Sequence, residues 1–208
     1  LFIEALRDRI DVAVRSPPFD TAQLDALLRR IEHGDDPAAR IPADIVWTPA
    51  ELDEAYEAVL AVPVPDSVRE ALAFFLGQLD FCRRASNRLE YMSKDTLHVA
   101  GRRVAHVCNE DCPLDKDAQL CTQTENGVSA RAWQSLLHFA KALAWFRGAA
   151  AVSLDDVVAL APWVLHEKLH PNPHSAWFQN PARQVLLIDR ATWIEQLFQR
   201  ALELQATW

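Results

Sequence analysis

The sequence predicts a mainly α-helical fold, and three observations support this prediction. Apolar residues recur at spacings of three and four residues in most segments of the chain, as they do on one face of an α-helix. Several of these segments begin with Ser, Thr or Asp followed three residues later by an acidic or amide residue, which is the pattern of a capping box. The 208 residues include only 5 glycines and are 50% hydrophobic, a composition typical of a folded helical protein rather than a disordered chain.

Residues 1–18 are expected to hold a short helix and one strand. Residues 1–9 have helical spacing, whereas residues 10–14 alternate between apolar and polar types as a strand does. The strand is expected to end at Pro17 and Pro18, because proline cannot donate to a β-ladder or continue a helix. The chain begins with Leu1 and enters a helical pattern at once, so we expect it to be a segment of a longer polypeptide.

Three helices are expected between residues 20 and 84. The first has a capping residue at Asp20 and ends at Gly34. The second begins at Thr48, which is followed by proline at the first helical position and completes a capping box with a glutamate. The third follows a proline-rich break and covers residues 66–84.

Residues 86–127 interrupt the helical pattern, and residues 97–107 resemble a small β-hairpin. The four cysteines lie in or beside this insertion. Four thiolates can hold Zn²⁺ or a [4Fe–4S] cluster, and a nearby histidine can replace one of them. Four unrelated thiols are the alternative, and the spacing does not decide between these interpretations. The candidate metal ligands are Cys82, Cys108, Cys112 and Cys121, with His98 and His106 as substitutes.

Three further helices are expected beyond the insertion. Ser129 is a suitable capping residue for the first, and Ser153 opens a capping box for the second. Pro162 is expected to kink or restart that second helix. A loop over residues 171–181 then leads to an amphipathic helix over residues 190–205.

Composition and charge exclude several classes of protein. The net charge of −8 disfavours nucleic-acid binding, because phosphate contacts need clustered Lys and Arg. No apolar run approaches the roughly 20 residues of a membrane helix, and no signal peptide is present, so a cytoplasmic protein is expected. Trp133, Trp145 and Trp193 lie on apolar helix faces and are expected to be core or docking residues rather than a surface that stacks bases.

Residues 4–11 read EALRDRID. This stretch resembles the A-L-x-D-R-F-D motif of AAA+ ATPases of the MoxR and minichromosome-maintenance groups, with Ile10 in place of Phe. In those proteins the arginine that matches Arg9 reaches the γ-phosphate of a neighbouring subunit. A planar guanidinium suits this role of an arginine finger, although an ordinary arginine at the end of a helix is the alternative.

A second resemblance follows in the order found in that family. Residues 127–133 read GVSARAW, residues 140–144 read AKALA, and residues 147–157 read RGAAAVSLDDV. Together they resemble the signature of MoxR-type lids. The resemblance makes Arg131 the sensor-2 residue, which contacts nucleotide phosphate, and the helix N-terminus at this position already favours an anion.

The resemblance implies an all-helical AAA+ lid bundle with a short α/β remnant of the ATPase core and a cysteine-bearing hairpin insertion. Residues 1–18 would be the end of the core, residues 19–170 the lid with its insertion at 86–127, and residues 171–208 a C-terminal loop and helix. Neither GxxxxGK[ST] nor a Walker B motif is present, so ATP and Mg²⁺ are expected to bind mainly to sequence upstream of Leu1.

The function implied by the resemblance is ATP hydrolysis coupled to the remodelling or maturation of protein partners, as in a chaperone. The partners would be other copies of the chain in a ring, usually a hexamer, and protein clients such as a von Willebrand factor A-domain protein. One alternative is a helical interaction module stabilised by a metal or an iron–sulfur cluster. Another is a zinc peptidase, because His166, Glu167 and His170 form an HExxH pattern.

Overall fold

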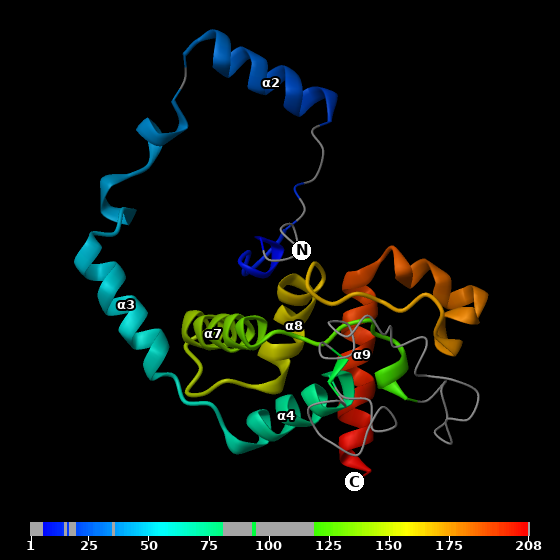
Figure 1. The fold of residues 1–208 in the computed structure, drawn as a ribbon. Helices are drawn as coiled ribbons and strands as arrows, with labels where there is room; N and C mark the ends of the chain where they lie inside the picture. Colours follow the sequence, from blue (N-terminus) through cyan, green and yellow to red (C-terminus); the bar gives the residue numbers. More distant parts are fainter. Residues whose placement is uncertain are drawn as a thin grey trace. The chain divides into compact units, whose positions relative to one another are not determined.

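The computed structural model of the chain describes residues 6–14, 16, 20–34, 36–80, 93–94 and 119–207. Within these ranges the structure is helical and forms no β-strand, which confirms the predicted fold class, and one isolated β-bridge joins Thr124 and Pro171. The longer helices are α2 (Thr21–Glu32), α3 (Pro49–Ala61), α4 (Asp66–Asp80), α7 (Ala130–Phe146), α8 (Leu154–Leu165) and α9 (Arg190–Ala206) (Figure 1). Short 3₁₀ helices are η1 (Pro37–Arg40), η2 (Ala43–Ile45), η4 (Leu120–Thr122), η5 (Ala176–Gln179) and η6 (Pro181–Leu187).

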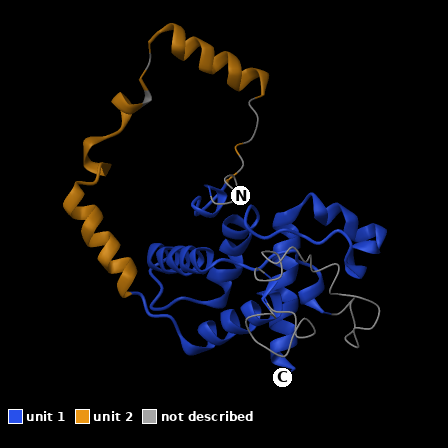
Figure 2. Ribbon diagram, in the orientation of Figure 1, with its two compact units in different colours: residues 1–13, 62–208 blue, residues 14–61 orange. Residues whose placement is uncertain are grey.

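The chain divides into two compact units (Figure 2). One unit contains residues 1–13 and 62–208, and with them α4, α7, α8 and α9. The other unit contains residues 14–61, and with them α2 and α3. The division therefore falls at other positions than the predicted domain boundaries after residues 18 and 170, which remain predictions.

The helices begin where the capping patterns predict. The Asp20 carboxylate accepts a hydrogen bond from the backbone N–H of Gln23 at 2.7 Å, and the Gln23 side chain accepts one from the backbone N–H of Asp20. Ser153 and Asp156 form the corresponding box at the start of α8. Gly34 and Gly148 have φ angles of +63° and +69°, a left-handed conformation that favours glycine where a helix ends.

The core of the larger unit lies between α8 and its neighbours. α8 packs against α7 on one side and α9 on another, and α4 also packs against α9. Phe75 of α4 stacks on Phe198 of α9 with ring centroids 3.8 Å apart. Phe75 also packs edge-to-face against the ring of Trp133 on α7. Trp193 is fully buried, and Trp133 and Trp145 pack against the core, so the prediction for the three tryptophans is confirmed.

Pro162 is expected to kink or restart the second helix beyond the insertion, and the structure rules out the restart. α8 continues through this residue to Leu165 instead of restarting. Proline removes one backbone hydrogen bond of the helix, but the face around it is buried against the core. Burial of Ala161, Pro162 and Val164 therefore stabilises a continuous helix where the local sequence alone allows a restart.

Residues 10–14 also differ from the predicted strand. They have no regular secondary structure, and the backbone N–H of Ala13 donates a hydrogen bond to the carbonyl of Trp163 on α8 at 3.2 Å. A strand needs a neighbouring strand for its ladder, and the described part of the chain forms none. The segment instead packs along helices, with Val12 half-buried against the core.

Candidate functional site

The site is built around the N-terminus of α7, where Arg131 lies. The loop that leads into this helix is held by Asp80 at the end of α4, whose carboxylate accepts a hydrogen bond from the backbone N–H of Val128 at 2.7 Å. Gly127 passes so close to this carboxylate that a Cβ atom would lie 2.8 Å from its Oδ1. The close approach of the Asp80 carboxylate therefore leaves no room for a side chain at position 127, which explains the glycine.

Ser129 joins the start of α7 to the N-terminal segment. Its Oγ accepts a hydrogen bond from the backbone N–H of Ala132 at 3.1 Å and thereby caps the helix, as predicted. The same hydroxyl donates a hydrogen bond to Oδ1 of Asp8 at 2.5 Å. Asp8 is the last of the helical residues 6–8, one residue before Arg9.

Asp11 makes the second connection to α7. Its Oδ1 accepts a hydrogen bond from the hydroxyl of Ser135 at 2.6 Å and lies 3.8 Å from Nε of Arg131. The Ser135 hydrogen bond lowers the pKa of Asp11 below its ordinary value, and the positive charges of Arg131 and Lys168 act in the same direction against the opposing effect of burial. Asp11 is therefore ionised at neutral pH and forms an ion pair with the predicted sensor-2 residue.

An open pocket lies beside this ion pair. Its volume is about 440 Å³, and the Arg131 side chain at its wall is 51% exposed. The guanidinium is therefore accessible to a ligand. The pocket is lined by Asp11, Arg131, Gln134, Ser135, His138 and Phe139.

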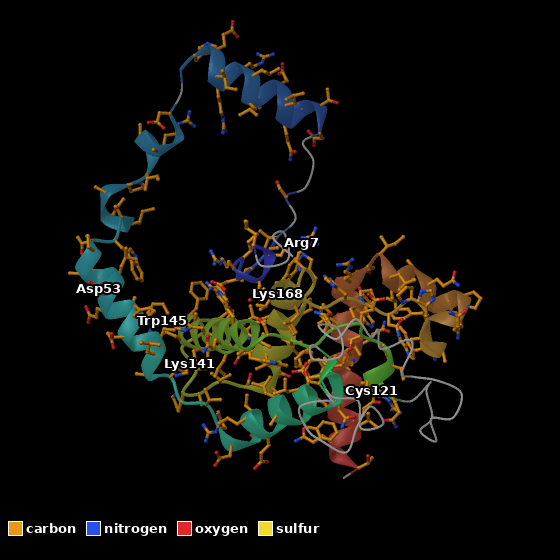
Figure 3. All side chains as sticks on the ribbon, in the orientation of Figure 1. Arg7, Asp53, Cys121, Lys141, Trp145 and Lys168 are labelled. Carbon is orange, nitrogen blue, oxygen red and sulfur yellow. The ribbon has the colours of Figure 1, made fainter. Side chains whose placement is uncertain are left out.

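Lys168 lies in the turn that follows α8 (Figure 3). The residue is only 8% exposed, and among the described residues its ammonium nitrogen has no hydrogen-bond partner. Burial lowers the pKa of Lys168, whereas the nearby carboxylates of Asp8 and Asp11 oppose this shift. The sequence alone gives no individual role to Lys168, Asp8, Asp11 or Ser135, since their contacts join distant parts of the chain.

Arg9, the predicted arginine finger, lies at the end of the N-terminal turn. Its side chain is exposed, and within the described residues it forms no ion pair. The flanking carboxylates of Asp8 and Asp11 contact α7, so the backbone on both sides of Arg9 is held against the helix that carries Arg131. The structure thus brings the segments of the two predicted arginines together and leaves both side chains accessible.

The HExxH pattern has a different geometry from a helical zinc site. α8 ends at Leu165, a turn over residues 166–168 follows, and His170 lies beyond that turn, so His166 and His170 are not on consecutive turns of one helix. His166 Nδ1 lies 3.0 Å from the carbonyl of Pro162, and the backbone N–H of His170 donates to the side chain of Asn126. Within the described ranges, no group of three His, Cys, Asp or Glu residues is placed to hold a metal ion.

The predicted cysteine site lies mostly outside the described residues. This applies to Cys82, Cys108 and Cys112, to His98 and His106, and to the expected hairpin at 97–107. Cys121 is described and is half-buried on η4 (Figure 3). Coordination of Zn²⁺ or an iron–sulfur cluster by these cysteines stays a prediction from the sequence.

Arg147 and Asp156, which belong to the signature of MoxR-type lids, form an ion pair that their spacing in the sequence did not predict. Arg147 Nη1 lies 2.7 Å from Oδ1 of Asp156, whose side chain is only 3% exposed. The other oxygen of Asp156 accepts hydrogen bonds from the backbone N–H and the hydroxyl of Ser153 at 2.9 and 2.7 Å. These three residues join the end of α7 to the start of α8.

Comparisons with known proteins support an AAA+ lid region in this chain. Residues 117–185 match the family model described as the AAA lid domain. The fold is similar to that of a crystal structure from Cytophaga hutchinsonii, described as a "putative ATPase", with a TM-score of 0.52 and 14% identity over 95% of this chain. The chain spans 47% of that protein's chain, and at this identity the likeness shows the fold alone. Among curated proteins, none matches the chain.

The helices of the described residues differ from membrane-spanning helices. None of them has both the length and the apolar character needed to cross a membrane.

Proposed function

We propose that this chain is the lid portion, together with the arginine-finger end of the core, of a MoxR-type AAA+ ATPase. In this proposal ATP hydrolysis in a ring is coupled to the remodelling or maturation of protein clients. The observation that carries the proposal is the cluster at the N-terminus of α7. There the turn that bears Arg9 is joined to the helix that bears Arg131 by two Asp–Ser hydrogen bonds.

Arg131 fits the role of a phosphate ligand. It lies in the first turn of α7, where the helix dipole and free backbone N–H groups favour an anion. Its guanidinium is half-exposed and lies 3.8 Å from Asp11, a separation longer than a hydrogen bond. A phosphate oxygen would therefore compete with a weak ionic contact rather than with a short bidentate one.

Arg9 fits a role at a different nucleotide. Its exposed side chain lies on a turn whose backbone is fixed, which suits a group that reaches out to a neighbouring subunit. A fixed position matters because an arginine finger stabilises charge on the phosphoryl group in the transition state. In a ring of identical chains, Arg131 would then contact one nucleotide and Arg9 the next.

The chain itself supplies only part of such a nucleotide site. Its sequence has no P-loop to surround the β-phosphate and no Walker B carboxylate to hold Mg²⁺. We propose that these groups belong to another part of a longer protein. This proposal is consistent with the likeness to a structure of which the chain spans 47%.

Calorimetric titration with ATP tests this division of roles. The 208-residue chain is expected to bind ATP too weakly to detect, whereas the longer protein that contains it should bind ATP, and Arg131→Ala should weaken that binding. Lys141→Ala, further along α7, is the matched control because it also removes one positive charge from this helix. Micromolar binding by the 208-residue chain, or unchanged affinity in the Arg131→Ala protein, would contradict the proposal.

A further inference from the structure

Another cavity lies in the larger unit, and none of its lining residues lines the pocket beside Arg131. Its volume is about 670 Å³, which is in the range of ligand-binding pockets. One wall is the exposed face of α9 between residues 192 and 203, and the other is formed by Trp177 of η5 and Arg183 of η6. η6 packs against α9, so the same packing positions both walls (Figure 1). Gln123, which follows η4, completes the lining.

Gln123 lines this cavity with an amide whose nitrogen has no acceptor among the described residues. The residue is only 3% exposed, and its backbone N–H and carbonyl form hydrogen bonds with Leu120 and Asn172 at 3.0 and 2.8 Å. The indole N–H of Trp193 donates to Oε1 of Gln123 at 3.4 Å. Because that N–H can only donate, it determines which atom of the amide is the oxygen. A nearly buried side chain is thus held in place with two N–H groups that can donate to a ligand.

Arg183 supplies a positive charge at the wall of the cavity. Its guanidinium lies over the Trp177 ring, 4.9 Å from the ring centroid, and its Nη1 donates to the Trp177 carbonyl at 3.4 Å. Trp177 in turn packs edge-to-face against Phe178, which is buried in the core. A guanidinium held on an aromatic ring is oriented in advance for a planar carboxylate. The amide of Gln123 and the guanidinium therefore both favour a negatively charged oxygen acceptor.

The other charges of the lining select the kind of anion. Arg200 and Glu203 form an ion pair at 2.8 Å, so their charges largely cancel. Glu195 lines the same wall, and its negative charge opposes that of Arg183. A polyanion such as a nucleic acid gains little from a lining whose charges balance. A single carboxylate needs only the guanidinium and the amide donors.

The wall along α9 has the length of a short extended peptide. Its lining residues extend from residue 192 to residue 203, which is about 16 Å along the helix axis. That length matches about five residues of an extended chain. Gln196 and Gln199 are exposed on this wall, and their amides can both donate to and accept from the peptide groups of such a chain.

We propose that the cavity between α9, Gln123 and Arg183 binds an extended peptide through one carboxylate. This carboxylate accepts hydrogen bonds from the Gln123 amide and the Arg183 guanidinium. The partner is a segment of another protein that carries an aspartate or glutamate side chain. The peptide site does not rest on the proposed ATPase function, because none of its residues belongs to the cluster at the N-terminus of α7.

NMR titration of the 208-residue chain tests the site without any variant. The probe is an end-capped alanine pentapeptide with one central glutamate, and the control peptide has glutamine in its place. The glutamate peptide should shift the side-chain amide signals of Gln123 and the indole N–H signal of Trp177 until the site is saturated. The glutamine peptide should bind about tenfold more weakly, because it lacks the charge-assisted hydrogen bonds. Inorganic phosphate, the third probe, should also bind more weakly than the glutamate peptide.

Two variants test the individual contacts. Arg183→Gln removes the charge, and Gln123→Glu keeps an acceptor for Trp193 but replaces the amide donors by a negative oxygen. Each should weaken binding of the glutamate peptide by about tenfold or more. Arg30→Gln, which removes an exposed arginine of α2, is the matched control and should bind like the parent.

Three results would overturn the proposal. The first is the absence of a saturable shift with the glutamate peptide, and the second is equal binding of that peptide and either the glutamine peptide or phosphate. The third is parental binding by the Arg183→Gln protein. Should Gln123→Glu fail to fold, the comparison of the two peptides on the parent chain decides alone, because it requires no substitution. ATP takes no part in these titrations, so a failure of the proposed ATPase function would leave their results as they are.

Discussion

The hydroxyl of Ser129 caps α7 and also donates a hydrogen bond to Asp8, a residue 121 positions earlier in the chain. One side chain thus fixes the start of the helix that carries Arg131 and the turn that precedes Arg9. Because a hydroxyl has one proton and two lone pairs, it can accept from the helix and donate to the carboxylate at the same time. The two arginines of the family resemblance are thereby linked through a single capping residue.

Gly127→Ala should lower the stability of the chain by about 1–3 kcal/mol, because the new methyl group would meet the Asp80 carboxylate. A Cβ at this position would lie 2.8 Å from Oδ1, and moving the carboxylate would weaken its hydrogen bond to Val128. Gly77→Ala is the matched control: it lies within α4 with no atom within 4 Å of the added Cβ, and it should raise stability by roughly 0.5–1 kcal/mol. Urea unfolding measures both, and effects of the same sign in the two variants would refute the steric explanation.

Asp156→Ala should be strongly destabilising, by about 3 kcal/mol, because it removes both a helix cap and the partner of Arg147. The Asp156 carboxylate is buried and accepts from Arg147 and twice from Ser153. The neighbouring Asp155 is exposed in the same first turn of α8 and provides the control. Asp155→Ala should cost less than about 1 kcal/mol, and equal losses in the two variants would show that the Arg147–Asp156 pair contributes little.

The pKa of Asp11 should lie below its ordinary value of 3.8 in the folded chain, chiefly because Ser135 donates a hydrogen bond to the ionised form. A depressed folded pKa means that the unfolded chain binds the proton more readily. The contribution of Asp11 to stability is therefore complete above about pH 4 and is lost as the pH falls through the lowered pKa. NMR titration of the Asp11 carboxyl carbon measures the midpoint, and Ser135→Ala should raise it toward 3.8. A midpoint at or above 3.8 in the parent chain would contradict the assigned hydrogen bond.

The local features of the fold could be predicted from the sequence because their causes are local. Asp20 and Ser153 cap helices as their spacing to the third following residue predicts, and Ser129 caps α7 as its residue type predicts. Gly34 follows the end of α2 because its positive φ angle is a backbone conformation that glycine adopts readily. Such features require no knowledge of the rest of the chain.

The candidate site could not be predicted from residue spacing, because it is built from contacts between residues far apart in the sequence. Asp8 meets Ser129 and Asp11 meets Ser135 across 121 and 124 positions of sequence. The continuation of α8 through Pro162 likewise depends on burial against other helices. The motifs identified Arg9 and Arg131, but the acidic residues that hold their segments together, and the buried Lys168, became apparent only from the fold.

The central claim is that Arg9 acts on a nucleotide held by another subunit, and ATP hydrolysis by the longer protein to which we propose that this chain belongs tests it most directly. Arg9→Ala should reduce turnover by about 10³-fold or more while ATP affinity changes little, because a finger acts mainly on the transition state. Arg7→Ala is the control, since Arg7 is another exposed arginine two residues away on the same turn (Figure 3).

Mixing the Arg9→Ala protein with a variant that lacks a working P-loop makes the same measurement specific for action between subunits. The Arg9→Ala protein supplies a working P-loop, and the P-loop variant supplies Arg9. Mixed rings should therefore recover part of the ATP hydrolysis that neither protein shows alone. Recovered turnover in the mixture, with Arg7→Ala active at the parental rate, is the result that the proposed function predicts. Parental turnover by the Arg9→Ala protein on its own would contradict it.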